Sequence, residues 1–181
     1  IKIALQYWKN IGNKKKTEIA TIENGYHGDT FGVMSVGYVP EFFGKFKKQL
    51  FSTIQFPVPN KYRMPKGFTL TDYQNQCLDR IERRFSKQDN IAAFVMESGA
   101  QVAGGVIIYP KGFQKKISQL CKKYNVLFVL DEIATGFGRL GSMTQYEEQK
   151  SIPDIVAYGK MLTGGYLTMA ATLSSKKIYD S

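Results

Sequence analysis

Residues 126–132 read Val-Leu-Phe-Val-Leu-Asp-Glu, five apolar residues that run directly into two acids. The run predicts a strand that is buried on both faces. A similar run, IAAFVM, occupies residues 91–96, and an amphipathic helix is predicted between the two, over residues 111–124. Strands that are apolar on both faces and separated by helices are typical of a parallel sheet covered on two sides. The sequence therefore predicts an α/β fold.

The rest of the chain extends this alternation in both directions. Four of the six prolines lie between residues 40 and 65, so residues 37–70 are expected to be ordered but irregular. No internal repeat or low-complexity linker interrupts the pattern, which predicts one domain. The other expected elements are a helix over 1–11, a strand over 17–22, a helix that Asp29 or Thr30 caps, a helix from a Thr71-Asp72 cap to about residue 85, and short strands over 155–157 and 169–173.

Composition narrows the class of protein. The 181 residues are 43% hydrophobic and carry a net charge of +10, and no apolar run is long enough to cross a membrane. Two distant cysteines and a single histidine predict neither a disulfide framework nor a histidine-rich metal site, so no metal and a reducing, cytoplasmic setting are expected. Lysine dominates the basic residues, which favours a solvated surface over nucleic-acid binding. A non-catalytic, basic nucleotide- or nucleic-acid-binding module remains the alternative.

Two charged residues stand at the ends of buried strands. Ligands of parallel sheets collect at the carboxyl ends of the strands, where Asp131 and Lys160 are expected. A carboxylate there needs a cationic or hydrogen-bonding partner, and burial of the lysine would favour a nucleophilic amine. Pyridoxal phosphate (PLP) requires both groups, an amine for a Schiff base and an anion at its ring nitrogen. An ordinary ion pair is the simpler alternative, and a Mg²⁺ site would normally come with a phosphate-binding loop that is not found here.

A longer set of motifs resembles the class III aminotransferases over essentially the whole chain. The resemblance implies a PLP-dependent transferase of fold type I, with residues 1–181 forming part of the large, PLP-binding domain. An N-terminal segment and a small C-terminal domain would lie outside the chain, which alone should be inactive. It also implies a homodimer with shared active sites, a small-molecule amino donor and a keto acceptor. The motifs are residues 24–30 (NGYHGDT), 131–139 (DEIATGFGR), Gly159-Lys160 and 163–165 (TGG).

The resemblance also implies a role for each matching residue. Lys160 would hold the cofactor and move a proton, Asp131 would keep the pyridine nitrogen protonated, and Tyr26 would lie against the ring. His27 would be a packing and hydrogen-bonding neighbour. The remaining cofactor contacts would be Gly25, Ile133, Glu97 and Gln101, and Asp29, Arg139, Gly165 and Tyr26 would line the substrate side. For Asp29 and Arg139, a salt bridge that fixes a loop is the alternative.

Three details resemble the biotin-pathway branch of this family: Ile133-Ala134, Asp29-Thr30 and residues 162–172 (LTGGYLTMAAT). They imply amino transfer from S-adenosylmethionine to 7-keto-8-aminopelargonate. Lysine as donor, or a class III activity on ornithine, 4-aminobutyrate or β-alanine, are the alternatives. The chain departs from the usual family pattern at Ser98, where proline is common, and at Val102, where glycine is common. These departures bear on the expected role of Gln101.

Overall fold

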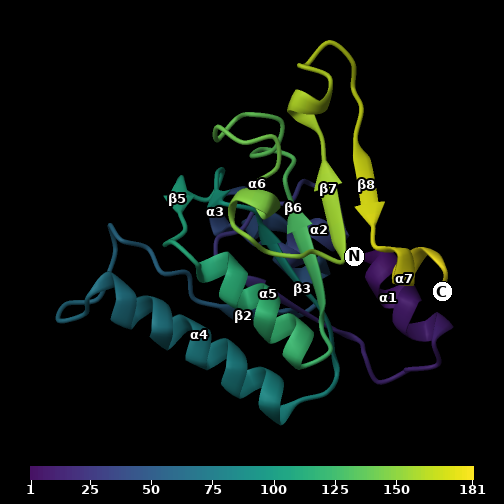
Figure 1. Ribbon diagram of the computed structural model, residues 1–181, viewed down its shortest axis with the longest axis horizontal. Helices are drawn as coiled ribbons and strands as arrows, with labels where there is room; N and C mark the ends of the chain where they lie inside the picture. Colours follow the sequence, from purple (N-terminus) through teal and green to yellow (C-terminus); the bar gives the residue numbers. More distant parts are fainter.

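The computed structural model describes residues 1–181, which form a six-stranded sheet with helices on both faces (Figure 1). The predicted α/β fold is confirmed. The first five strands in spatial order are parallel, and β8 at the edge runs antiparallel to β7. In spatial order the strands are β2 (Ile54–Phe56), β1 (Glu18–Ile22), β3 (Ile91–Glu97), β6 (Leu127–Asp131), β7 (Ile155–Tyr158) and β8 (Ala171–Ser174).

The helices connect these strands, and a small hairpin lies outside the main sheet. The hairpin pairs β4 (Ala100–Gln101) with β5 (Ile107–Ile108). The α-helices are α1 (Lys2–Asn10), α2 (Phe31–Val36), α3 (Pro40–Phe43), α4 (Leu70–Lys87), α5 (Phe113–Lys123), α6 (Gln145–Glu148) and α7 (Lys176–Tyr179). Two 3-10 helices, η1 (Gly44–Gln49) and η2 (Lys160–Leu162), complete the chain.

The alternation of side chains along β3 divides the core into two layers. Phe94 and Met96 pack with the apolar faces of α4 and α5, whereas Ala93 and Val95 belong to the layer that contains Trp8 of α1. Successive side chains of a strand point to opposite faces, so an uninterrupted apolar run fills both layers. The seven residues of β3 are all buried. This two-sided burial holds the carboxyl ends of the central strands at one edge of the sheet.

Four local predictions need correction. Strand β2 was not expected, because it has only three residues inside the proline-rich segment. Strand β8 begins at Ala171, two residues later than predicted, and is antiparallel. Helix α4 has its N-cap at Thr69, whose hydroxyl accepts from the Asp72 amide while the Asp72 carboxylate accepts from the Thr69 amide. At the start of α2, Thr30 occupies the N-cap position without a side-chain bond.

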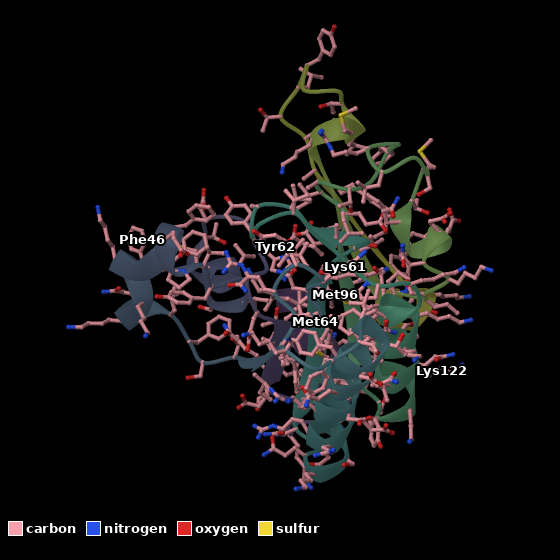
Figure 2. All side chains as sticks on the ribbon, turned by 90° about the vertical axis from the view of Figure 1, so that its left-hand side faces the viewer. Phe46, Lys61, Tyr62, Met64, Met96 and Lys122 are labelled. Carbon is pink, nitrogen blue, oxygen red and sulfur yellow. The ribbon has the colours of Figure 1, made fainter.

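Lys122, one of the lysines of the expected basic surface, is exposed to solvent. Figure 2 shows Lys122 on the outer side of the helices and Phe46 at the far end of the segment that contains α3 and η1.

Cys77 and Cys121 are buried and free. None of the helices combines the length and the apolar character that a membrane span requires.

Candidate active site

Strand register brings two of the predicted residues side by side. Glu97 at the end of β3 pairs with Asp131 at the end of β6, and Asp131 pairs with Ala157 of β7. Lys160 follows the last residue of β7, Tyr158, after a single intervening residue, Gly159. All these strands are parallel, so their carboxyl ends meet at one edge, where ligands of such sheets bind.

Both oxygens of the Asp131 carboxylate have a hydrogen-bond partner within the chain. Oδ2 lies 2.8 Å from Nδ1 of His27, and Oδ1 accepts from the amide of Ile133 at 2.9 Å. The His27 side chain is 4% exposed and that of Asp131 is 11% exposed. Because each carboxylate oxygen has two lone pairs, these contacts fix the group and leave it able to accept a further hydrogen bond. His27 is thus the hydrogen-bonding neighbour that the sequence predicted, with Asp131 as the partner.

Glu97 joins the loops that follow β1 and β3. Its Oε1 accepts from the Tyr26 amide at 3.1 Å and its Oε2 from the Val102 amide at 2.9 Å. The residue is 4% exposed, and this burial raises the pKa of the carboxyl, against the lowering effect of the two amides. The Val102 amide makes this contact although Val102 departs from the family pattern. Glu97 therefore positions backbone rather than presenting a free carboxylate.

Gln101 and Gly25 lie in the same junction. Gln101 Nε2 donates to the Glu23 carbonyl at 2.7 Å, whereas its buried Oε1 has no partner. A Cβ on Gly25 would lie 3.3 Å from Nε2 of His27, another buried atom without a partner. The approach of Gly104 to Asn24 is tighter, because a Cβ on Gly104 would lie 1.8 Å from the Asn24 carbonyl oxygen. Glycine is required there so that the two loops can approach each other.

Tyr26 is held in a fixed orientation by an aromatic cluster. Its ring is nearly parallel to that of Phe43, with centroids 5.9 Å apart, and meets Phe42 edge-on. Its hydroxyl donates to Asp29 Oδ1 at 2.9 Å, and this hydrogen bond is the main reason that the pKa of Tyr26 is raised. The Asp29 carboxylate therefore accepts a hydrogen bond from Tyr26 and does not cap helix α2, which was one of the two expected caps.

Lys160 has an unusual backbone conformation and a free amine. Its φ is +47°, in the left-handed region that non-glycine residues rarely adopt, and such strain is found preferentially at functional sites. The side chain is exposed and makes no hydrogen bond or ion pair. The burial expected from the sequence is therefore not provided by this chain. Next to it, a Cβ on Gly159 would lie 3.3 Å from Ile133 Cγ2, so Ile133 packs against the lysine's neighbour.

Two predicted substrate residues lie at the exposed rim of this region. Arg139 follows the left-handed pair Phe137 and Gly138. Neither Arg139 nor Asp29 forms an ion pair, so the alternative of a loop-fixing salt bridge is not found. Gly165 is exposed in the segment between η2 and β8, with a φ of +85°. The structure links neither residue to Asp131 by a hydrogen bond. Both stay candidates for substrate contact.

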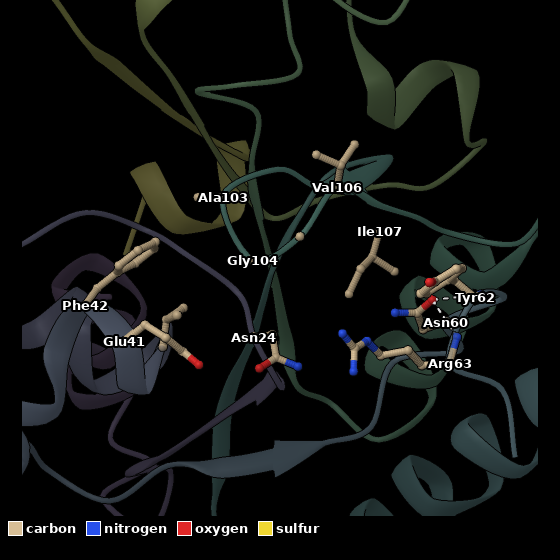
Figure 3. Close-up of a pocket in the computed structure, with 12 residues that line it drawn as sticks. Asn24, Glu41, Phe42, Asn60, Tyr62, Arg63, Ala103, Gly104, Val106 and Ile107 are labelled. Atoms are coloured by element: carbon tan, nitrogen blue, oxygen red, sulfur yellow. Dashed lines mark hydrogen bonds between the residues drawn. The ribbon is translucent and has the colours of Figure 1, made fainter.

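A cleft of about 780 Å³ opens beside Asn24 (Figure 3). Glu41 and Arg63 lie on its opposite walls, and Gly104 forms part of the boundary between them. Neither Asp131 nor Lys160 lines this cleft. Asp131 and Lys160 therefore lie at the edge of the sheet and not in this cleft.

Comparison with known proteins decides the family. The family model for class III aminotransferases matches residues 1–181. The chain belongs to the class III aminotransferases. The resemblance seen in the motifs is thus confirmed.

Several relatives of this class III aminotransferase chain have the same name. An adenosylmethionine-8-amino-7-oxononanoate aminotransferase from Staphylococcus aureus is 45% identical over 100% of this chain and 41% of its own length. One from Methanocaldococcus jannaschii is 40% identical over 99% of this chain and 42% of its own length. The chain thus spans about two fifths of the length of these relatives.

Solved structures agree with the fold. The crystal structure of the Methanocaldococcus jannaschii enzyme superposes with a TM-score of 0.84 at 38% identity, over 99% of this chain and 39% of that one. A thermostable (S)-enantioselective omega-transaminase from Thermomicrobium roseum gives a TM-score of 0.93 at 32% identity, over 99% and 40% of the two chains. The expected transaminase fold is therefore confirmed, with a mostly parallel sheet flanked by helices.

The donor set of this class III chain fits pyridoxal phosphate. The cofactor needs a carboxylate for its ring nitrogen and an amine for its aldehyde. Asp131 supplies a preorganised carboxylate with unused lone pairs, and Lys160 supplies an amine with no partner in the chain. No group of three or more acidic, cysteine or histidine residues is arranged to hold a metal ion.

Sequence reasoning missed the residues that support the site from behind. Gln114 and Ser151 are buried, and neither belongs to a motif. Gln114 is hydrogen-bonded to the loop after β3, and Ser151 accepts from Gln114. A glutamine in the first turn of an amphipathic helix gives no signal that it faces inward. The bond between His27 and Asp131 had one available signal, because His27 follows the end of one central strand and Asp131 ends another.

Proposed function

We propose that this chain is the PLP-binding part of an aminotransferase that moves an amino group from S-adenosylmethionine to 7-keto-8-aminopelargonate. The observation that carries the proposal is the Asp131 carboxylate, fixed by His27 and the Ile133 amide one strand away from a free lysine. The names of the relatives from Staphylococcus aureus and Methanocaldococcus jannaschii support the choice of acceptor and donor. PLP, when bound, supplies an electron sink for the substrate's Cα–H bond.

The residues of the chain would divide the work as follows. Lys160 Nζ would hold the cofactor covalently and take up the proton from the substrate Cα. Asp131 would accept a hydrogen bond from the protonated ring nitrogen, with its orientation set by His27. Tyr26 and Ile133 would border the two faces of the ring, while Gly25, Glu97 and Gln101 would fix the loops around it. Asp29, Arg139 and Gly165 would face the substrate.

Assembly and location are part of the same proposal. The surface carries large exposed apolar side chains on two segments, which supports a homodimer with shared active sites. We expect a cytoplasmic enzyme that acts on small molecules, in which this chain forms part of the large domain. The exposed side chains are Phe31, Phe42, Phe46 and Phe51 on the first segment, and Tyr166, Leu167, Met169 and Leu173 on the second.

The proposal is tested with the full-length protein loaded with PLP. Each amino donor is added without acceptor, and loss of the visible absorbance of the bound cofactor reports the half-reaction. S-adenosylmethionine should consume the absorbance. If lysine alone does so, the donor assignment is wrong. If only ornithine, 4-aminobutyrate or β-alanine reacts, the biotin-pathway assignment is wrong.

A pair of lysine variants tests the site itself. Lys160→Ala should abolish the absorbance of covalently held cofactor, because no other amine follows β7 at the sheet edge. Lys122→Ala, on the outer face of α5, should retain it. A wild-type protein that fails to bind PLP but binds DNA in a salt-sensitive manner would instead support the basic-module alternative.

A further inference from the structure

A ring of buried hydrogen bonds lies behind the end of the sheet, between α5 and the loops after β3 and β6. Gln114, in the first turn of α5, is completely buried. Its Nε2 donates to Ser98 Oγ at 3.0 Å and to Ser151 Oγ at 2.9 Å, and its Oε1 accepts from the Gly99 amide at 2.8 Å. Both amide hydrogens and the carbonyl oxygen are therefore used, as a buried side chain requires.

The ring closes through Glu132. The Glu132 carboxylate is buried, and the ring closes through the backbone, because the Ser98 amide donates to the Asp131 carbonyl at 2.9 Å and Glu132 directly follows Asp131. That carboxylate accepts from the amides of Gln145 at 3.0 Å and Tyr146 at 2.6 Å, and Ser151 Oγ donates to the Tyr146 carbonyl at 3.3 Å. The ring thus joins four segments that are far apart in the sequence, and removing one member leaves buried polar atoms without partners.

This ring contacts the backbone of the residue that would bind the cofactor. The Ser98 amide donates to the Asp131 carbonyl at 2.9 Å, and the Glu132 amide donates to the Ala157 carbonyl at 2.9 Å. Ser98 directly follows Glu97, and Glu132 directly follows Asp131. The ring therefore fixes the backbone at Asp131, while His27 and the Ile133 amide fix its carboxylate.

Ser98 has a particular place in this arrangement. Proline, which the family usually carries at this position, has neither an amide hydrogen nor a hydroxyl. Here the amide bonds to Asp131 and the hydroxyl takes part in the ring. This chain thus holds the ends of β3 and β6 together with contacts that proline could not make.

We propose that the ring of Ser98, Gln114, Glu132 and Ser151 is a positioning device, which sets the direction of the Asp131 carboxylate toward the cofactor's ring nitrogen. These residues act through Asp131 and do not touch the cofactor. The inference rests on the proposed function, because it requires that PLP binds at Asp131. It goes beyond that proposal by assigning a role to four residues to which the family resemblance assigns none.

The test compares two leucine variants of the same helix in the full-length protein loaded with PLP. Gln114→Leu removes the centre of the ring, and Gln119→Leu changes an exposed glutamine of α5. We expect Gln114→Leu to weaken PLP binding by roughly tenfold, as losses of outer partners of ligating groups do. It should also change the visible circular dichroism of the bound cofactor, which reports the orientation of its ring. Gln119→Leu should match the wild type in both measurements.

A milder variant guards against loss of folding. Ser98→Ala removes the hydroxyl but keeps the amide that bonds to Asp131, so it should weaken PLP binding less than Gln114→Leu and change the dichroism in the same direction. The proposal is wrong if both variants lower the unfolding temperature of the cofactor-free protein while PLP affinity and dichroism stay at wild-type values. A wild-type protein that binds no PLP would overturn the proposed function as well, and the two failures are distinguished before any variant is made.

Discussion

At the scale of single residues, Asp131 combines a fixed direction with unused hydrogen-bonding capacity. His27 and the Ile133 amide hold one oxygen each, and the side chain is only slightly exposed. A carboxylate held in this way needs no reorganisation when a cationic ring nitrogen arrives. The charge of the carboxylate, and not its shape, is what the proposed reaction requires.

The variant Asp131→Asn separates charge from shape. The amide keeps the size of the side chain but cannot stabilise a protonated ring nitrogen, so the half-reaction should slow by about two to four orders of magnitude. Stopped-flow absorbance of the PLP-loaded full-length protein measures this rate. An unchanged rate would show that the ring nitrogen lies elsewhere.

The buried carboxyl of Glu97 predicts a pH dependence of stability. Burial raises its pKa above the ordinary value of 4.5, so between the ordinary and the raised pKa the folded state binds more protons than the unfolded state. The contribution of Glu97 to the free energy of unfolding therefore falls as the pH rises from about 4.5 through the raised pKa. Above that pH range, the folded state must hold the Glu97 carboxylate in its charged form at a buried position, which lowers the free energy of unfolding.

Urea unfolding of the full-length protein at a series of pH values measures this effect. The stability of the wild type relative to Glu97→Gln should decline across the window, because glutamine does not titrate. Glu148→Gln, at an exposed position of α6, is the control and should show no such decline. A difference between wild type and Glu97→Gln that is independent of pH would contradict the assignment.

At the scale of elements, α4 shows how a helix start can be misplaced by two residues. The sequence Thr69-Leu70-Thr71-Asp72 offers two threonines, and the pattern alone pointed to Thr71 with Asp72. The structure uses Thr69, because its hydroxyl and the Asp72 carboxylate then satisfy each other's amides three residues apart. This reciprocal pair requires two residues three positions apart, so it cannot be recognised from one capping residue alone.

The two threonines form a matched pair of variants. Thr69→Ala removes the cap and should lower the free energy of unfolding by about 1 kcal/mol. Thr71→Ala, inside the first turn, should be nearly neutral because alanine is a good helix former. Chemical denaturation measures both changes. Equal losses in the two variants would contradict the capping assignment.

Gly104 tests the junction between the loops after β1 and β3. An added Cβ would overlap the Asn24 carbonyl oxygen, so Gly104→Ala must displace the loop that leads to Tyr26. We expect weaker PLP binding and lower stability than in the wild type. Gly44→Ala, where nothing lies within 4 Å of the added Cβ, should leave both properties unchanged. Titration with PLP and thermal unfolding give the two values, and wild-type PLP affinity in Gly104→Ala would show that the junction does not control the site.

Sequence patterns predicted the central strands well because those strands are apolar on both faces. Strand β3 and the run that ends at Asp131 therefore appeared as uninterrupted apolar stretches. Strand β2 escaped prediction because three residues between prolines show no pattern, and the direction of β8 depends on pairing that no local sequence encodes. The same holds for the site: its motif residues were predictable, whereas Gln114 and Ser151 act through contacts between distant segments.

At the scale of the whole molecule, two segments carry large apolar side chains that are exposed in this chain. Tyr166 is 93% exposed in the segment between η2 and β8, close in sequence to Lys160. Large exposed apolar patches are typical of interfaces. A subunit interface at this segment would bring the partner close to the site.

The variant Tyr166→Ser tests this assembly in the full-length protein. Sedimentation velocity over a range of concentrations should show weaker dimerisation than in the wild type. The control is Tyr179→Ser, which changes a tyrosine that is 84% exposed on α7, outside both apolar segments. An unchanged dimer in Tyr166→Ser, or equal weakening in both variants, would argue against this segment as the interface.

The antiparallel course of β8 anchors the segment that carries Lys160. Because β8 returns alongside β7, with Tyr158 paired to Ala171, the chain from Gly159 to Ala170 is a closed loop whose two ends are anchored on the same edge of the sheet. Lys160 stands at the anchored foot of this loop, while the glycines at 164 and 165 lie further out. The pairing of β7 with β8 therefore restrains the backbone at Lys160 more directly than the outer part of the loop, so we expect a change in the outer part to leave the position of this lysine unaltered.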